Sequence, residues 1–383
     1  MSEISVAIIG SRGIPAKYGG FETFAEKLST KLVERKHSVT VSCEYESKMM
    51  EEYRGVRLHY FPLPSPKSYF LRKIYETFSD IYFIYKLSKR NDILYLLGAG
   101  AGLFLFIPKL FRTKVIVNIA GVEWKRDKFN KIEKALVKLN TILATLFSDN
   151  IIIDSKEMKK YVSKSFWNKT VYISYGIEEP KKIKWDKKKI NELLGTIGVI
   201  DGLIPNNYWL VVARLEPENN IHTILKCFLD SEIKKPLLVV GNFTSKKYRA
   251  KINEILKNDK EKKVIMAGGI YDRELLFMLR QNCFGYIHGH SVGGTNPSLL
   301  EAMVMKNLII AHDNEFNREV GGDAILYFRD ANNLAKLIQI IENNPDKYIH
   351  LKKAAYSRVK SNYSWDDVVE KYERVFEEIG GHE

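Results

Sequence analysis

Cysteines are few in this sequence, and none is spaced to pair with another. Of the 383 residues only Cys43, Cys227 and Cys283 are cysteines, and no Cys-x-x-Cys pair occurs. Cys43 and Cys283 lie in apolar runs that predict strands, and Cys227 lies in a predicted helix. We therefore expect three buried thiols in a reducing compartment, which argues against a disulfide or a zinc site.

Long uncharged runs are missing as well. The run 93–107 has 15 residues without a charge, whereas a membrane-spanning helix needs about 20. Glycines interrupt this run and Pro108 follows it, so we expect a strand, a glycine-rich turn and a short buried helix. The start, MSEISVAIIG, carries an acidic Glu3 and leads directly into a strand, so we expect no signal peptide.

The short motifs of several enzyme classes are also absent. The loop 10–23 (GSRGIPAKYGGFET) has neither the Gly-x-Gly-x-x-Gly spacing of a dinucleotide site nor the Gly-Lys-[Ser/Thr] of a P-loop. No Gly-x-Ser-x-Gly elbow occurs, and no Asp-x-Asp stands beside a strand end. His288 and His290, two residues apart, are too few for a metal site. We expect no metal and no bound cofactor.

Acidic residues are scarce in the first half of the chain. Residues 1–180 hold 29 Lys/Arg against 19 Asp/Glu, and residues 181–190 (KKIKWDKKKI) hold six lysines and one aspartate. The net charge of the whole chain is +14. A local basic surface therefore has to explain the charge. Because no RNA-recognition, KH or helix-turn-helix string appears, nucleic acid is not the expected partner.

Residues 61–114 combine positive charge with aromatic side chains. They hold nine Lys/Arg and three Asp/Glu, and such a surface suits an anionic membrane. The alternative is that the aromatics pack a helix into the core, which we expect for half of them. We expect a cytoplasmic protein held peripherally at the inner face of the plasma membrane. The aromatics are Phe61, Tyr69, Phe70, Tyr75, Phe78, Tyr82, Phe83 and Tyr85.

Apolar runs alternate with helix-length segments along the whole chain, which is too long for one ordinary core. This alternation predicts parallel, doubly wound sheets, and it restarts after the lysine-rich linker. A helix is expected from about Phe21 and another over 363–379. The predicted strands are 5–10, 39–43, 56–61, 92–97, 115–120, 150–154, 170–176, 208–213, 236–241, 263–268, 284–289 and 307–312.

The predicted fold class is therefore α/β, with two Rossmann-like domains facing a cleft. We place an N-terminal domain at 1–180 and a C-terminal domain at 181–360. The helix within 361–383 is expected to pack back toward the N-terminal domain. Ligands of such sheets bind outside the carboxyl ends of the strands.

The loop 10–23 opens a helix, and its glycines let backbone amides approach an anion. A tight turn without a ligand is the alternative, but Arg12 and Lys17 favour a role in binding. In the second domain Arg214 follows the strand 208–213, where its guanidinium can hold a diphosphate by two parallel hydrogen bonds. A surface ion pair with Glu216 or Glu218 is the alternative there.

The run HGHSVGGTNPSLLEAM (288–303) passes from a strand through glycines into a helix. Asn296 or Thr295 suits the N-cap and Pro297 the first helical position. The free amides of the first turn, near Ser298 and Leu299, predict a diphosphate site. Glu301 is then placed for ribose hydroxyls; the alternative is an acid that interacts only with the helix dipole.

With these strings the chain resembles glycosyltransferase family 4, which has the twin-Rossmann B-type architecture. SVAIIGSRGIPAKYGGFETFAEKL, NIAGVEWKRDKF, VARLEPENNI and YIHGHSVGGTNPSLLEAM are similar to the bacterial rhamnosyltransferase branch. The resemblance implies assembly of capsular or cell-wall polysaccharide on a lipid carrier. It implies L-rhamnose transfer from dTDP-rhamnose to a lipid-linked saccharide, retaining and without a metal.

The resemblance also implies that the domain 1–180 binds the acceptor and that the domain 181–360 binds the nucleotide sugar. It implies roles for single residues as well. Arg214 binds the donor diphosphate, Glu301 the ribose, and the backbone near Ile270 and Tyr271 the base, while Arg214, Glu301 and Glu123 are the catalytic candidates. The expected donor contacts are Gly20, Arg214, Asn219, Gly241, Ile270, Tyr271, His290, Gly294, Thr295, Asn296, Ser298 and Glu301. The expected acceptor contacts are Arg12, Gly19, Gly20, Trp124 and Lys125.

Three departures from the family pattern concern the donor sugar. Gly293 stands where a sugar-binding glutamate is usual, Asn219 where a lysine is usual, and Ala120 and Gly121 where His-Asp is usual. A 6-deoxy sugar has no O6 hydroxyl, which fits a site with fewer polar ligands. A UDP or GDP sugar, a sugar-nucleotide epimerase of the same fold and a non-catalytic carbohydrate-binding protein remain alternatives.

Overall fold

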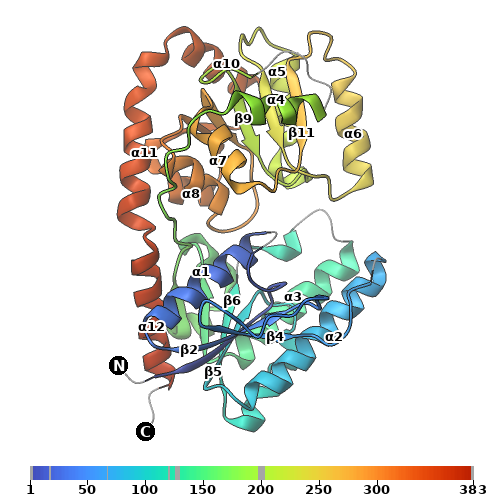
Figure 1. Cartoon of the computed structure of the whole chain (residues 1–383), viewed down its shortest axis with the longest axis vertical. Coiled ribbons are helices and arrows are strands. Elements are labelled where there is room, and N and C mark those ends of the chain that lie inside the picture. Colours follow the sequence, from blue (N-terminus) through green and yellow to red (C-terminus); the bar gives the residue numbers. More distant parts are fainter. Residues whose placement is uncertain are drawn as a thin grey trace. The chain divides into compact units, whose positions relative to one another are not determined.

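The computed structural model describes residues 3–16, 19–66, 68–119, 121–125, 130–196 and 203–380. The chain divides into two compact units. Unit one is Met1–Tyr175 together with Trp365–Glu383, and unit two is Gly176–Ser364. Each unit is a sheet of mainly parallel strands with helices on its faces (Figure 1). The predicted α/β class is confirmed in both units.

Unit one is built on an eight-stranded sheet in the order β3-β4-β2-β1-β5-β6-β7-β8. All its neighbouring strands are parallel except β3 and β4. All five residues of β5 are buried, as expected for a parallel sheet covered on both faces. The strands are β1 (Ser5–Ile9), β2 (Ser38–Cys43), β3 (Glu52–Tyr53), β4 (Val56–Tyr60), β5 (Ile93–Leu97), β6 (Lys114–Ile119), β7 (Asn150–Ile153) and β8 (Thr170–Tyr172).

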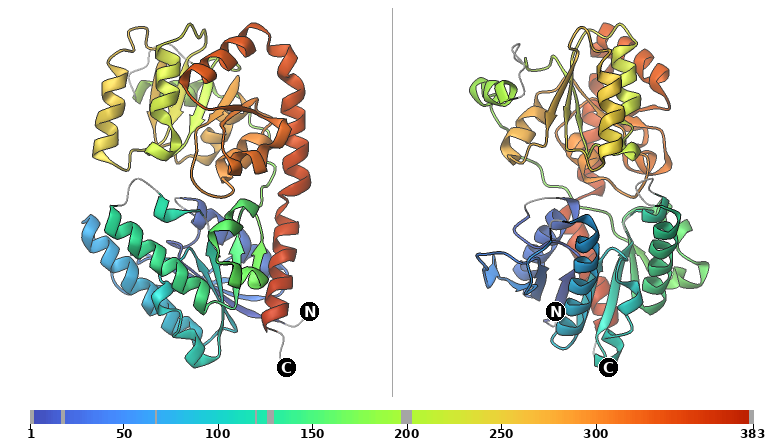
Figure 2. Two further views of the ribbon diagram at one scale, coloured as in Figure 1. Left: turned by 180° about the vertical axis from the view of Figure 1, so that it is seen from behind. Right: turned by 90° about the vertical axis from the view of Figure 1, so that its right-hand side faces the viewer.

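Helices cover both faces of this sheet. In the views of Figures 1 and 2, α2 and α3 lie on one side of it and α12 lies on the other. The α-helices are α1 (Gly20–Glu34), α2 (Tyr69–Ser88), α3 (Lys131–Phe147) and α12 (Trp365–Gly380). The 3-10 segments are η1 (Gly102–Phe104), η2 (Pro108–Phe111), η3 (Glu123–Lys125), η4 (Lys156–Tyr161) and η5 (Lys164–Lys169).

Helix α12 packs on α1 and the sheet of unit one. The Tyr372 hydroxyl lies 2.6 Å from the Tyr95 hydroxyl of β5, and Lys31 of α1 pairs with Asp366 at 3.0 Å. The helix predicted over 363–379 is confirmed, because the apolar positions expected on its inner face are all buried. They are Trp365, Val368, Val369, Tyr372 and Phe376.

Unit two is built on a six-stranded parallel sheet in the order β11-β10-β9-β12-β13-β14. Its strands are β9 (Trp209–Val212), β10 (Leu237–Val240), β11 (Val264–Gly268), β12 (Gly285–His288), β13 (Ile309–His312) and β14 (Leu326–Phe328). Its helices are α4 (Lys187–Thr196), α5 (Ile221–Leu229), α6 (Lys246–Leu256), α7 (Arg273–Gln281), α8 (Pro297–Val304), α9 (Glu315–Gly321), α10 (Ala331–Asn343) and α11 (Ile349–Asn362), with η6 (Pro217–Asn219), η7 (Gly322–Ala324) and η8 (Pro345–Tyr348).

The sequence analysis missed two strands, and one helix that it predicted does not form as an α-helix. Strands β3 and β14 have two and three residues, too few for a periodic pattern. The short buried helix expected before residue 107 is replaced by the 3-10 segments η1 and η2, and Leu103 and Phe106 there are exposed. In the described part of the chain, every helix is too short or too polar to cross a membrane.

The three cysteines are free and buried, as predicted. Cys283 does not lie in a strand, however, because it precedes the first residue of β12. Burial raises the pKa of the Cys227 and Cys283 thiols to about 12, which keeps both protonated and unreactive.

The aromatics of 61–114 divide between core and surface. Phe61, Tyr75 and Phe83 are buried, and the rings of Phe61 and Tyr75 meet edge to face at 5.1 Å. Phe78 and Tyr85 are exposed. The side chains of Tyr69 and Phe70 lie outside the described part of the structure, as do Lys17 and Ala120.

Candidate active site

The expected diphosphate ligand Arg214 lies just beyond the carboxyl end of β9. Its side chain is 47% exposed, and its Nη2 lies 3.8 Å from the buried Glu216 carboxylate. The ion pair between Arg214 and Glu216, which the sequence analysis considered as an alternative, is thus present, although its two atoms are not in hydrogen-bond contact. Because almost half of the Arg214 side chain is exposed, a ligand can reach the guanidinium while Glu216 stays in place.

Asn219, at the usual lysine position, ties two loops of unit two together. Its Nδ2 donates to the Arg214 carbonyl at 2.7 Å, and its Oδ1 lies 2.8 Å from Nδ1 of His290. Because an amide oxygen only accepts, this contact assigns the proton of His290 to Nδ1. Both ends of the Asn219 amide are therefore engaged, and its contribution is to hold the loop that carries Arg214.

The loop between β12 and α8 is fixed from several sides. The Glu218 carbonyl accepts hydrogen bonds from both the amide and the hydroxyl of Ser291, at 2.9 and 2.8 Å. Asn314 and Asn317 donate their side-chain amides to the His290 carbonyl, at 2.9 and 2.8 Å. A Cβ at Gly289 would lie 2.1 Å from the Asn219 carbonyl oxygen. Only glycine allows this close approach.

Helix α8 begins as predicted, with Asn296 as N-cap and Pro297 at its first position. The amide expected to be free at Ser298 is not free, because it donates to Oδ1 of Asn296 at 2.9 Å. The Leu299 amide also donates to the Asn296 carbonyl, at 3.0 Å. Pro297 has no amide proton. An anion at this helix therefore has to draw on the helix dipole and on loop amides before Pro297.

The Ser298 hydroxyl belongs to an internal network. It lies 2.7 Å from the Tyr286 hydroxyl and 3.1 Å from the Val212 carbonyl. Burial raises the pKa of Tyr286, so this phenol stays protonated as a donor. The network joins β9, β12 and α8, and it leaves the serine side chain to position the helix.

Arg280 on α7 is the residue that the sequence analysis missed. It is 1% exposed, and its Nη2 lies 2.9 Å from the Glu301 carboxylate. It also donates from Nη1 to the Ser298 carbonyl at 3.0 Å and from Nη2 to the Ser298 hydroxyl at 2.9 Å. The guanidinium carbon lies 5.4 Å from the centre of the Tyr286 ring. Arg280 therefore holds both Glu301 and the first turn of α8.

No sequence signal pointed to Arg280. Arg280 directly follows the buried Met278 and Leu279. An arginine near the end of a helix is ordinarily expected to be exposed to solvent, where its charge interacts favourably with the helix dipole. Only the packing of α7 against α8 shows that its charge is buried and paired.

The expected base-binding residues lie at the carboxyl end of β11. Tyr271 is 65% exposed, and its hydroxyl accepts a hydrogen bond from the Asn242 side chain at 2.8 Å. Oδ1 of Asn242 also accepts from the Gly269 amide, at 2.9 Å, so Asn242 fixes this loop. Ile270 is half-buried. Gly241 has φ +153°, and a Cβ there would lie 1.8 Å from the Ala213 carbonyl oxygen.

A cavity of about 440 Å³ adjoins these residues on the β10 side. Its lining is mixed in polarity, and it includes two of the strand-end glycines. The lining residues are Leu215, Gly241, Asn242, Phe243, Arg249, Asn253, Leu256, Met266 and Gly268.

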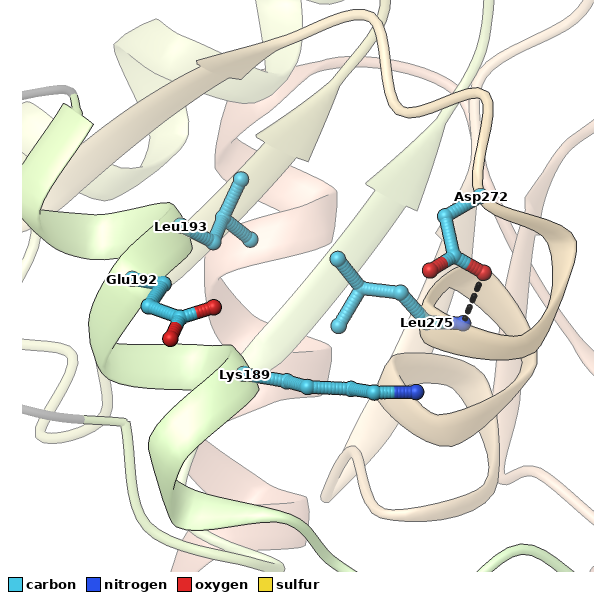
Figure 3. Close-up of a pocket in the computed structure, with 5 residues that line it drawn as sticks. All are labelled: Lys189, Glu192, Leu193, Asp272 and Leu275. Atoms are coloured by element: carbon cyan, nitrogen blue, oxygen red, sulfur yellow. Dashed lines mark hydrogen bonds between the residues drawn. The ribbon is translucent and has the colours of Figure 1, made fainter.

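A second cavity, of about 360 Å³, lies between α4 and the start of α7 (Figure 3). Asp272 in its wall caps α7 by accepting from the Leu275 amide at 3.1 Å, and Lys189 pairs with Glu274 at 2.9 Å. Lys189 and Asp272 are thus engaged by their neighbours, and the cavity contains none of the predicted site residues. We therefore place the candidate site elsewhere.

In unit one, two carboxylates of α1 accept hydrogen bonds from backbone amides of the glycine-rich loop 10–23. Glu22 accepts a hydrogen bond from the Arg12 amide at 3.2 Å, and Glu26 accepts one from the Ala16 amide at 2.7 Å. Burial raises the pKa of Glu22. Gly19 has φ +98° and directly precedes Gly20, the first residue of α1. The Arg12 guanidinium lies 3.7 Å from Glu44.

The other predicted residues of unit one form η3, close to the end of β6. Trp124 meets the Tyr161 ring edge to face at 6.3 Å, and Lys125 donates to the Tyr161 hydroxyl at 3.1 Å. Glu123 is half-buried beside them. The acceptor candidates Trp124 and Lys125 thus converge on one tyrosine of η4.

Metal ligands do not cluster in the part of the chain that the structure describes. His288 is buried, and burial lowers its pKa well below the usual value of 6.5. The ring therefore stays neutral between Tyr286 and His290.

Three solved structures show which fold this is. Sucrose-phosphate synthase from Thermosynechococcus elongatus aligns with a TM-score of 0.80 at 15% identity, over 99% of this chain and all of that one. Anabaena HepE in complex with UDP and glucose gives 0.76 at 14%, over 98% and 100%. The catalytic domain of starch synthase IV from Arabidopsis thaliana, bound to ADP and acarbose, gives 0.74 at 14%, over the full length of both. The chain has the GT-B glycosyltransferase fold.

Among curated proteins the chain matches a glutamyl-tRNA reductase from Wigglesworthia glossinidia brevipalpis, 28% identical over 214 residues. The match takes in 51% of this chain and spans about half (46%) of that protein's length. It is too partial to indicate a shared activity.

Family models account for both units. Residues 3–178 match a domain of unknown function, DUF1972, and residues 204–358 match glycosyl transferases group 1. The second match contains β9, β12 and α8 with Arg214, Asn219, His290 and Glu301. Unit two is thus similar in sequence to glycosyl transferases group 1, and unit one to DUF1972.

Proposed function

We propose that this protein is a glycosyltransferase that moves a sugar from a nucleotide sugar to an acceptor hydroxyl without a metal ion. One observation carries the proposal. In the group 1 domain, Arg214, the start of α8 and Glu301 lie at the carboxyl ends of β9 and β12. Ligands of open α/β sheets bind at these ends.

The main catalytic task is to stabilise the negative charge that grows on the departing diphosphate. The exposed guanidinium of Arg214 presents a fork of donors to phosphate oxygens. The α8 dipole adds partial positive charge. Glu301 is a quarter exposed beyond its bond to Arg280, and its carboxylate is suited to accept from ribose hydroxyls.

We propose a retaining transfer in which the donor phosphate itself takes the proton of the acceptor hydroxyl. Glu123 is the second candidate for the base, because it is a half-buried carboxylate beside the acceptor candidates Trp124 and Lys125. Product stereochemistry tests the first statement: an inverted anomeric centre would contradict it.

The proposed donor is dTDP-L-rhamnose. It is supported by the resemblance to the rhamnosyltransferase branch and by Gly293, which offers no side chain to a sugar hydroxyl. A UDP sugar is the second candidate, because the similar HepE structure holds UDP and glucose. A thermal-shift panel of dTDP-rhamnose, UDP-glucose, GDP-mannose and ADP-glucose separates them, since a ligand stabilises the fold that binds it.

The proposed acceptor is a lipid-linked saccharide in bacterial surface polysaccharide synthesis. Incubation of the protein with donor alone tests the epimerase alternative. An isomerised nucleotide sugar would support the epimerase, whereas unchanged donor that is consumed only with acceptor would support transfer.

A further inference from the structure

Helix α3 of unit one carries a stripe of large apolar side chains that the described part of the chain does not cover. The stripe residues recur every three or four positions, so they share one face of the helix. Each is at least half exposed, and Ile132 reaches 74%. The opposite face holds the buried Thr141, Ala144 and Thr145. The stripe consists of Ile132, Leu136, Leu139, Ile142 and Leu146.

The segment η1–η2 extends this stripe. Leu103, Phe106 and Leu110 are exposed there, Leu110 to 73%. The segment is fixed to α3, because the Leu103 amide donates to the Asn140 side chain at 3.2 Å and the Phe106 ring lies 6.4 Å from that of Phe147. The two elements therefore present one surface.

Helix α2 continues the surface on the far side of η2. Tyr85 of α2 meets Phe111 of η2 edge to face at 5.8 Å. The exposed apolar residues of α2 again lie on one helical face, and Figures 1 and 2 show α2 and α3 on the same side of the sheet. These residues are Leu71, Ile74, Phe78 and Tyr85. Together with the α3 stripe and the exposed residues of η1–η2 they form what we call the apolar face.

The stretch of chain that supplies the apolar face has a net positive charge. Residues 69–149, which supply all of it, hold 14 Lys/Arg against 7 Asp/Glu. Lys131 and Lys134 lie in the first turn of α3, where the helix dipole disfavours a positive charge. Apolar stripes flanked by lysines are typical of helices that lie in the interface of an anionic bilayer.

We propose that the apolar face docks onto an anionic lipid surface, with α2 and α3 in the headgroup region and their lysines at the phosphates. The proposal rests on the proposed function in one respect, since the acceptor there carries a lipid. A second copy of the chain fits less well, because a self-paired contact would bring two basic surfaces together. Exposed apolar patches larger than a few hundred Å² are rare on proteins without such a partner.

Flotation of the full chain with vesicles tests the proposal without any donor. We expect binding to vesicles of phosphatidylglycerol and phosphatidylcholine, and at least tenfold weaker partitioning of Leu136→Gln/Leu139→Gln/Ile142→Gln. The matched control is Ile204→Gln/Ile340→Gln/Ile349→Gln, three exposed isoleucines of unit two, which should bind within twofold of wild type. Melting curves establish that both variants fold.

A second variant tests the charge. Lys131→Gln/Lys134→Gln/Lys138→Gln should lose several-fold binding to phosphatidylglycerol vesicles, and added salt should reproduce the loss in wild type. The proposal is overturned if wild type does not float, or if the leucine variant floats as well as wild type. Loss of a dimer in the leucine variant, without flotation of wild type, would assign the face to self-association. Donor-induced thermal shifts that persist in any of these cases would leave the proposed function standing.

Discussion

The two units share a doubly wound architecture but differ in where they place their polar and apolar side chains. Both units bury carboxylates, but among the described residues only unit two buries a guanidinium: Arg280 is 1% exposed and paired with Glu301. Unit one instead exposes apolar side chains across α2, η1–η2 and α3. A common fold thus supports a rigid, polar site in one unit and a broad external surface in the other.

The buried pair of unit two is where the largest stability effect is expected. Arg280→Met should destabilise the protein by about 3–5 kcal/mol, because it leaves Glu301 without its partner. Denaturant unfolding measures this. In the double variant Arg280→Met/Glu301→Leu much of the loss should return, since no charge then stays unpaired. An equal loss in the double variant would mean that Arg280 acts through packing alone.

Arg214 should matter for catalysis and not for folding. Arg214→Ala should lose about 2.7–4 kcal/mol of transition-state stabilisation, by analogy with the loss of one preorganised donor, with little change in melting temperature. The measurement is kcat/KM with a nucleotide sugar. Arg329→Ala, an exposed arginine of the same unit that pairs with Asp313, is the control and should stay within twofold. Equal effects of both changes would remove Arg214 from the site.

Glu123 in unit one offers a sharper test of which group takes the proton of the acceptor hydroxyl. If the donor phosphate takes the acceptor proton, Glu123→Gln should keep kcat within about threefold of wild type. General-base catalysis contributes about 10²–10⁴-fold, so a loss in that range would make Glu123 the base. Glu157→Gln, the same change at an exposed carboxylate of η4, is the control.

The smallest expected effects concern pH, and they have opposite signs in the two units. Burial raises the pKa of Glu22 in unit one above 4.5, so the folded state prefers the protonated acid. That preference stabilises the fold below about pH 4.5 and is lost as the pH rises through the raised pKa. Glu22→Gln should therefore raise Tm modestly at pH 7 and leave it unchanged at pH 4.

In unit two, hydrogen bonds from Arg318 and Arg329 lower the pKa of Asp313 to about 2. The stability that the Asp313 carboxylate contributes is present above pH 3.8, the ordinary pKa of an aspartate, and is lost as the pH falls toward 2. Asp313→Asn should thus lower Tm at pH 7 and converge with wild type near pH 2. Parallel melting curves at every pH would contradict the assignment.

Much of the fold could be predicted because long apolar runs determine buried parallel strands. All twelve predicted strands occur, with shifts of one to four residues at their ends. The C-terminal helix was predictable for a similar reason, since Trp365, Val369 and Tyr372 recur on one face. Local geometry in the site was predictable in part: the Asn296 cap and Pro297 occupy the expected positions.

The rest depends on contacts between residues far apart in the sequence. Two examples are the hydrogen bond between Asn219 and His290, 71 residues away, and the ion pair between Arg280 and Glu301. The same applies to the apolar face, whose members come from three separate segments. Hydrophobic spacing shows that a helix has an apolar side, but not whether the fold covers that side.

The sequence by itself therefore determined the two α/β sheets, the turn and cap positions, and the strand ends at which Arg214 and Glu301 lie. These follow from local periodicity and from backbone preferences, which act over a few residues. Only the tertiary structure decided which charges are buried, which amides remain available and which apolar stripe stays exposed. Burial and pairing are properties of the assembled chain, because each depends on what a distant segment places against the residue.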